Sequence, residues 1–157
     1  MNVKSLCGKV GVVTGAASGI GRATAIEMAS RGADIAICDL DRAGLQETAA
    51  TIEAMGRHVY THDVDVSEYD FVQSFADAVF GTLGRVDILV NNAGAGQLSD
   101  LLGHDEGLIR ESMDLMYFGP LHSSRAAIPH LRKRGGGRII NISSIFGKQP
   151  GGLVDYD

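Results

Sequence analysis

The stretch Thr14-Gly15-Ala16-Ala17-Ser18-Gly19-Ile20-Gly21 directly follows the apolar run Val10-Gly11-Val12-Val13. The run is typical of a buried β-strand, and the glycines after it indicate a tight turn into a helix. At such a junction backbone N–H groups point outward at the positive end of the helix dipole, where a pyrophosphate binds. We therefore predict a nucleotide-phosphate site with G-x-x-x-G-x-G spacing, although a glycine-rich turn can also bind nothing.

The three glycines of this turn have separate tasks. We expect Gly15, Gly19 and Gly21 to provide the tight turn, the close approach of the phosphates and the close packing of helix on strand. Ser18 and Ile20 lie between these glycines, and we assign them to the same phosphate-binding turn.

A carboxylate follows at the distance expected for a ribose-binding residue. The run Asp34-Ile-Ala-Ile-Cys-Asp39 ends about 20 residues beyond the glycines. Asp39 can accept hydrogen bonds from both ribose hydroxyls. Its charge repels a 2′-phosphate, which favours NAD over NADP. The next residue, Leu40, is assigned to the same cofactor site. Asp39 could instead cap the next helix, but Asp41 fits that position better and leaves Asp39 free for the ribose.

Three further segments, together with the glycine turn, carry a family resemblance. Asn91-Asn92-Ala93-Gly94 follows the predicted strand Val86 to Val90, Asn141-Ile-Ser-Ser144 follows a later strand, and Tyr156 comes behind it. In this combination and order, the chain resembles a short-chain dehydrogenase/reductase from about Leu6 to Tyr156.

The resemblance implies a function for each segment. In that family the glycine turn binds NAD(P), and the segment matching Asn91-Asn92-Ala93-Gly94 supports the central sheet beside the adenine side of the cofactor. Asp65-Val66 matches an aspartate-hydrophobe pair at the adenine ring. Asp63-Val64 is a second copy two residues earlier, so the register stays open.

The resemblance also assigns the catalytic groups. Carbonyl reduction needs a proton donor at the oxygen that becomes negative, and Tyr156 would supply that proton while Ser144 holds the substrate oxygen. A tyrosine with a pKa near 10 needs a positive charge nearby, which the family provides through a lysine four residues later. Without the other segments, this pair would be an ordinary strand end and a loop tyrosine.

The sequence departs from the family pattern in three places. The chain ends at Asp157, before the position of the lysine. Met116 stands where the family usually has an asparagine that bends a helix and holds a water of the proton relay, and a thioether cannot replace those hydrogen bonds. Ser144 and Tyr156 are one residue closer than in most members.

Strand and helix patterns alternate along the chain, which is typical of a parallel sheet covered on both faces. We predict a three-layer α/β/α, doubly wound Rossmann-type fold that lacks the last strands of the family, in one dinucleotide-binding domain over residues 1–157 that is incomplete at its C-terminus. The strands are predicted at Val10 to Val13, Ile35 to Cys38, His58 to His62, Val86 to Val90 and Arg138 to Ile142.

Two helical patterns are strong. One ends near Gly81, and its core face is predicted to contain Phe71, Val72, Phe75, Ala76, Val79 and Phe80. The other runs from Glu106 to Arg134, is broken near Gly119-Pro120 and is stopped by three glycines. In the family this second helix lines the active site on one side and a subunit interface on the other.

Composition limits the partners. A net charge of −5 argues against nucleic acid, and Arg132-Lys133-Arg134 fits a helix C-terminus better than a binding patch. Cys7 and Cys38 indicate no disulfide framework, and Cys38 fits a buried thiol. No apolar leader or membrane span is evident, and we identify no metal site. We expect a cytoplasmic protein. The resemblance implies a homo-oligomer, a dimer or a tetramer, that acts on a small alcohol or ketone.

Three functions remain open. The first is an NAD-dependent oxidoreductase acting on a secondary alcohol or ketone. The second is a non-catalytic dinucleotide-binding protein or an inactive fragment of such an enzyme, suggested by the absent lysine and Met116. The third is another Rossmann chemistry, such as methyl transfer from S-adenosylmethionine, against which Asn91 to Gly94 and the Ser144/Tyr156 pair discriminate.

Overall fold

A computed structural model describes residues 5–95 and 105–144 of the chain. These residues form a five-stranded sheet in the order β3-β2-β1-β4-β5, with every neighbouring pair parallel. The strands are β1 (Val10–Thr14), β2 (Asp34–Asp39), β3 (Val59–Asp63), β4 (Ile88–Asn91) and β5 (Arg138–Asn141). The order reverses between β1 and β4, and ligands of open α/β sheets bind beside the carboxyl ends of the strands at such a point.

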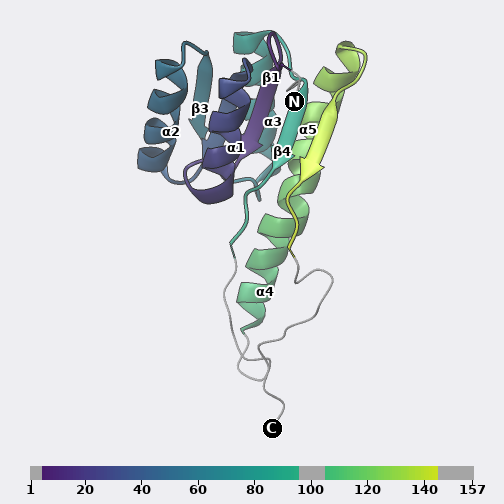
Figure 1. Cartoon of the computed structure of the whole chain (residues 1–157). Helices are drawn as coiled ribbons and strands as arrows, with labels where there is room; N and C mark the ends of the chain where they lie inside the picture. The colour runs from purple at the N-terminus through teal and green to yellow at the C-terminus, as the bar shows by residue number, and fades with distance from the viewer. Residues whose placement is uncertain (1–4, 96–104, 145–157) are drawn as a thin grey trace.

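Helices cover both faces of the sheet, as Figure 1 shows. Helices α1 and α2 pack on one face, and α3 and α5 pack on the other, which confirms the predicted three-layer doubly wound architecture. The helical segments are α1 (Gly19–Ser30), α2 (Arg42–Ala54), α3 (Tyr69–Leu83), α4 (Glu106–Met113), the π-helix η1 (Asp114–Phe118) and α5 (Gly119–Lys133).

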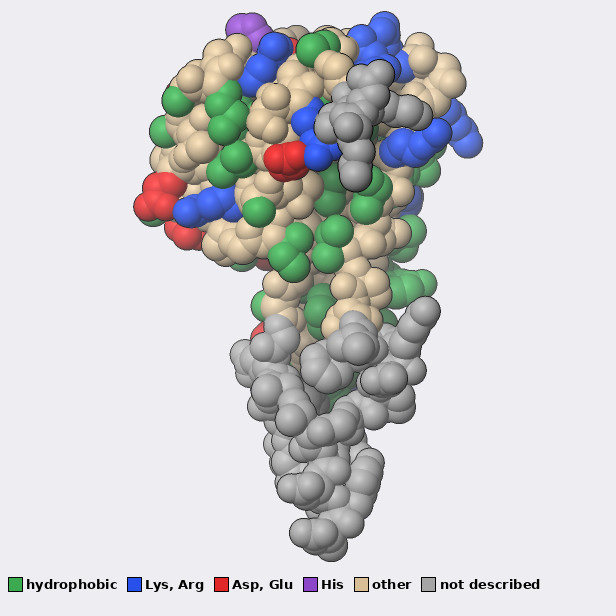
Figure 2. Space-filling view, viewed as in Figure 1, with side chains coloured by type: hydrophobic (Ala, Val, Ile, Leu, Met, Phe, Trp, Pro, Cys, Tyr) green, Lys and Arg blue, Asp and Glu red, His purple; other side chains and the backbone are tan. Residues whose placement is uncertain are grey.

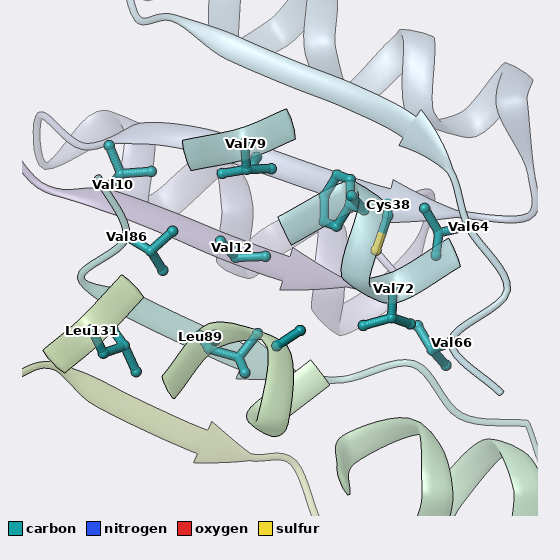
Figure 3. Packing of buried hydrophobic residues seen from close by; sticks show 14 residues of the cluster. Val10, Val12, Cys38, Val64, Val66, Val72, Val79, Val86, Leu89 and Leu131 are labelled. Carbon is teal, nitrogen blue, oxygen red and sulfur yellow. The ribbon is translucent and has the colours of Figure 1, made fainter. Parts of the chain in front are cut away.

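Alternation along the strands divides the buried apolar side chains into two clusters. Val10 and Val12 of β1 pack with the helices α3 and α5, where Figure 3 shows them among Val79 and Leu131. Val13 of the same strand belongs to the cluster on the α1 and α2 face. A parallel sheet with both faces buried reads as a near-continuous apolar run, which explains the strand patterns of the sequence.

All five predicted strands are confirmed, with small shifts at their ends. The largest shift is at β4, which begins at Ile88 rather than Val86. The residue before it, Asp87, accepts a hydrogen bond from the Val10 N–H through its carboxylate at 2.9 Å. A side chain therefore takes the place of a ladder bond at the start of this strand.

One predicted core residue is wrong. Phe71 is 63% exposed, whereas Val72, Phe75 and Val79 of the same helix are buried. At 100° per residue, Phe71 lies roughly 70° from the middle of that buried stripe. The apparent i, i+4 series from Phe71 therefore overestimates the width of the buried face.

The long second helix is present but not uniform. Asp105 caps α4 by accepting a hydrogen bond from the Gly107 N–H at 2.8 Å. The predicted break near Gly119 takes the form of the π-helical turn η1, which contains Met116 and leads directly into α5. π-Helical turns within longer helices are frequent at functional sites.

The surface has no single field of one charge on the face shown in Figure 2. Basic side chains gather at the C-terminal end of α5, where Arg132 and Lys133 lie in the last turn as predicted. On the opposite flank acidic and basic side chains stand beside one another. Within residues 5–95 and 105–144, no helix is long and apolar enough to cross a bilayer.

Candidate cofactor site

The candidate site is a hollow of about 1220 Å³ at the carboxyl edge of the sheet, counting the open space at its mouth. Eleven of the twelve residues predicted from the sequence to bind a cofactor line it, and only Gly21 does not. The eleven are Gly15, Ser18, Gly19, Ile20, Asp39, Leu40, Asp65, Val66, Asn92, Ala93 and Gly94. The structure thus brings together segments that lie up to about 80 positions apart in the chain.

Two glycines of the turn occupy positions that no other residue fits. Gly15 has a φ of 67°, and a Cβ there would lie 2.7 Å from the Ala93 Cα. A Cβ on Gly21 would lie 2.1 Å from the Gly15 carbonyl oxygen. Gly21 therefore acts behind the turn, where it allows helix α1 to approach β1, and this explains why it does not line the hollow.

The carbonyl groups of the turn are bonded inward. The Asn92 side-chain amide donates to the carbonyls of Thr14 at 3.1 Å and Gly15 at 3.0 Å. The buried Thr48 hydroxyl donates to the Ala16 carbonyl at 3.0 Å, and the Arg22 guanidinium donates to the Ala17 carbonyl at 2.9 Å.

These bonds determine what the turn presents to the hollow. With its carbonyl oxygens directed away, the turn offers the N–H groups of the first turn of α1, which have no intrahelical acceptor at any helix N-terminus. Those groups and the helix dipole favour an anion at this position. The arrangement fits the pyrophosphate of a dinucleotide.

Asp39 has structural partners in addition to its place in the hollow. Its Oδ2 accepts from the Ala17 N–H at 3.0 Å, and its Oδ1 accepts from the Leu40 N–H at 2.8 Å. As predicted, Asp39 does not cap α2, and its carboxylate also holds the glycine turn. Asp41 is the N-cap of α2, as predicted, and accepts from the Gly44 N–H at 3.1 Å.

The structure distinguishes the two aspartate-hydrophobe pairs. Asp65 lines the hollow, and its Oδ1 accepts hydrogen bonds from the backbone N–H and the hydroxyl of Ser67 at 2.9 and 2.7 Å. Asp63 ends β3 outside the hollow and pairs with Arg42. The register with Asp65-Val66 at the site is the one that the geometry favours.

Of the two predicted catalytic residues, the structure describes Ser144 only. Ser144 is exposed and follows β5, whose last residue accepts a 2.8 Å hydrogen bond from the Asn91 amide through the Asn141 Oδ1. Tyr156 lies outside the described residues. Met116 of η1 is 50% exposed, and a Cβ on Gly94 would lie 3.9 Å from its Cγ, so the thioether stands beside the hollow.

Four residues of the hollow were not predicted to bind a cofactor: Val64, Ala95, Leu115 and Ile142. Ile142 and Ala95 follow strands whose carboxyl ends meet at this edge, so the general rule for open parallel sheets could have identified them. Leu115 depends on the π-helical turn, which no periodic pattern in the sequence indicates.

Cys38 lies at the end of β2 close to these groups but has a structural role. Burial raises the pKa of its thiol to about 12, with a smaller contribution from the charge of Asp39. The thiol stays protonated at neutral pH and is not a nucleophile. The Cys38 carbonyl accepts hydrogen bonds from the N–H groups of Gly15 at 2.8 Å and Ala16 at 3.2 Å.

The profile of the short chain dehydrogenase family matches residues 9–155. This chain belongs to that family. The glycine turn, the sheet order and the segment from Asn91 to Gly94 thus occur together in a family whose members are oxidoreductases.

Individual relatives agree with this assignment. Human estradiol 17-beta-dehydrogenase 11 is 35% identical over 144 residues, which make up 92% of this chain and 48% of the relative. The structure of an NAD+-bound xylitol dehydrogenase superimposes with a TM-score of 0.91 at 30% identity, covering 94% of this chain and 57% of that one. The carveol dehydrogenase of Mycobacterium avium in complex with NAD gives 0.90 at 31% identity, covering 95% and 59%. The chain spans about half the length of the human relative.

Proposed function

We propose that the protein is an NAD-dependent oxidoreductase that interconverts a secondary alcohol and a ketone. The observation that carries this proposal is the hollow itself, because it joins the N-terminus of α1, Asp39 and the Asn92-Ala93-Gly94 segment at the point where the strand order reverses. Two of the similar solved structures contain NAD, which supports a nicotinamide cofactor. Such a cofactor would accept or donate a hydride when bound.

We propose NAD rather than NADP as the cofactor. Asp39 lines the hollow with its carboxylate fixed by the backbone N–H groups of three residues, so it is already oriented to accept further hydrogen bonds from ribose hydroxyls. A 2′-phosphate placed beside a fixed carboxylate is repelled. Asp65 adds a second carboxylate to the lining of the same hollow.

The catalytic groups that we propose are Ser144 and Tyr156. In this proposal the Ser144 hydroxyl donates a hydrogen bond to the substrate oxygen, and the Tyr156 hydroxyl gives a proton to that oxygen or takes one from it. Ser144 follows β5 at the same edge of the sheet as the hollow, which supports its part.

Titration and turnover test the proposal together. We expect the fluorescence of the reduced nicotinamide to change when NADH binds to the protein. The dissociation constant for NADPH should be larger than that for NADH. A panel of secondary alcohols and ketones, assayed by the absorbance of the reduced nicotinamide, then identifies a substrate. A protein that binds neither nucleotide would contradict the proposal.

A second candidate function is dinucleotide binding without catalysis. It is favoured by Met116, which stands beside Gly94 at the hollow and offers no hydrogen bond of the kind an asparagine makes there. The substitution Met116→Asn tests this candidate, because a rise in turnover would contradict it. It raises turnover if catalysis is present and limited by the proton relay, and it changes nothing in a protein that only binds.

We also propose that the substrate is a small molecule and that the protein forms a homo-oligomer. In this proposal the subunits associate through the surface of α4 and η1. Several large apolar side chains of this segment are 40% or more exposed: Ile109, Met113, Met116, Tyr117 and Phe118. Light scattering tests the proposal, and a monomer at high concentration would contradict it.

A further inference from the structure

The carboxyl ends of β2 and β3 place two aspartates side by side. Asp39 and Asp63 are register partners of the parallel pair, so they lie opposite each other on neighbouring strands. Such strands are about 4.8 Å apart, and paired residues point to the same face of the sheet. Asp39 lines the hollow, whereas Asp63 lies one strand further out.

Asp63 holds the first basic residue that follows Asp39 in the chain. Arg42 begins α2, and its guanidinium donates to the Asp63 Oδ2 at 2.5 Å. That hydrogen bond from Arg42 is the main reason why the pKa of Asp63 lies below its ordinary value, and the His62 ring stands 3.8 Å from the same carboxylate. Both members of the ion pair are exposed, with side chains 78% and 40% accessible.

Arg42 is the kind of residue that binds a nucleotide phosphate. A guanidinium forms bidentate hydrogen bonds with a phosphate, and an arginine near the ribose is how dinucleotide sites accommodate a 2′-phosphate. Arg42 lies three positions after Asp39, but its guanidinium is directed to β3, and Arg42 lines a separate groove with Asp63 and Leu45. The partner of this arginine therefore decides whether it can serve a phosphate.

We infer that Asp63 is a second determinant of cofactor specificity, which disfavours NADP by holding Arg42 on β3, away from the position of a 2′-phosphate. This inference rests on the proposed function. Without this pair, Asp39 alone would discriminate between NAD and NADP. With it, Arg42 and Asp63 contribute to the same discrimination. Because an exposed ion pair is weak, loss of one partner releases the other at little cost to the fold.

Three variants test the inference: Asp63→Asn, Arg42→Gln and the double variant. The dissociation constants for NADPH and NADH are measured by fluorescence titration for each. Asp63→Asn is expected to lower the ratio of the NADPH to the NADH constant by about three- to tenfold, since it removes a charge and frees an arginine for the phosphate. In the double variant most of this gain is lost.

Glu27→Gln is the matched control. Glu27, in the last turn of α1, belongs to another exposed ion pair with the C-cap residue Arg31, so the substitution changes the net charge equally at the opposite edge of the sheet. For Glu27→Gln, the ratio of the NADPH to the NADH dissociation constant is expected to equal that of the unmodified protein. Thermal melting of every variant shows that the fold is retained.

The outcomes separate this inference from the proposed function. If the unmodified protein binds neither nucleotide, the proposed function fails and this inference fails with it. If NADH binds but Asp63→Asn leaves the ratio unchanged, only the inference is overturned. It is also overturned if the double variant keeps the full gain, because Arg42 then has no part in it.

Discussion

Asn92 and Thr14 are joined by two hydrogen bonds that run in the same direction between different groups. The Asn92 backbone N–H donates to the Thr14 hydroxyl at 3.0 Å, and the Asn92 side-chain amide donates to the Thr14 carbonyl at 3.1 Å. The same hydroxyl accepts from the Ala93 N–H at 3.1 Å. The end of β4 is therefore tied to the last residue of β1, where the glycine turn begins.

The buried Thr14 hydroxyl is expected to be essential for this junction. Thr14→Val keeps the shape of the side chain but leaves the N–H groups of Asn92 and Ala93 without their acceptor. We expect the free energy of unfolding to fall by about 1–3 kcal/mol. Urea denaturation measures this change. Thr14→Ser is the control, because it keeps the hydroxyl and removes the methyl group, and a loss of stability confined to Thr14→Ser would show that the methyl group and not the hydroxyl matters.

The packing of α1 on the turn leads to a second prediction. In Gly21→Ala the new Cβ would meet the Gly15 carbonyl at 2.1 Å and the Asn92 amide at 2.5 Å. We expect stability to fall by about 1–3 kcal/mol and NADH affinity to fall about tenfold, because the turn must move.

Gly81→Ala is the control for Gly21→Ala. Gly81 lies within α3, and a Cβ there meets nothing within 4 Å. An alanine at a helical glycine is expected to stabilise the protein by about 0.5–1 kcal/mol and to leave NADH binding unchanged. Unaltered NADH binding in Gly21→Ala would contradict the role assigned to Gly21.

Local signals in the sequence predict the elements better than the contacts between them. The alternation of strands and helices, the cap at Asp41 and the end of α5 follow from patterns within a few residues. The pairing of Asn92 with the Gly15 carbonyl and of Thr48 with the Ala16 carbonyl joins residues far apart in the chain. No periodicity or composition indicates such pairs, and they are what orients the turn.

The carboxylate of Asp39 is expected to control cofactor preference. Asp39→Ala removes both the acceptor for ribose hydroxyls and the charge that repels a 2′-phosphate. We expect the dissociation constant for NADPH, divided by that for NADH, to fall by about tenfold. Asp41→Asn removes the same charge two residues away while keeping a good N-cap, so its ratio should change less. If Asp39→Ala and Asp41→Asn change the ratio equally, the preference for NADH comes from negative charge near the site and not from the position of Asp39.

Asp87 predicts a dependence of stability on pH. Burial alone would raise the pKa of its carboxyl, but hydrogen bonds from Arg85 and the Val10 N–H and the charges of Arg85 and Lys9 outweigh burial and hold the pKa below 3.8. The carboxylate thus contributes stability above the unfolded pKa near 3.8, and this contribution is lost as pH falls through the lower folded value.

Asp87→Asn tests this linkage. At neutral pH we expect the variant to be less stable by about 1.5–3 kcal/mol, since an amide cannot replace the charge-assisted bonds to Arg85. The difference from the unmodified protein should shrink as pH falls below 4, where the carboxylate takes up a proton. Unfolding curves between neutral pH and the acid limit measure it. A difference that stays constant with pH would show that the charge of Asp87 has no part in it.

The last prediction concerns the proposed chemistry at Ser144 and Tyr156. Tyr156→Phe keeps the ring and removes only the hydroxyl, so for a ketone that the protein reduces we expect kcat to fall by about 10²-fold or more. The dissociation constant of NADH should stay nearly the same, because the loss concerns a group that acts in the transition state. Ser144→Ala should lower kcat less, and Ser143→Ala is its control. If Tyr156→Phe reduces the ketone at the unmodified rate, Tyr156 is not the proton donor, and binding without catalysis becomes the better account of this site.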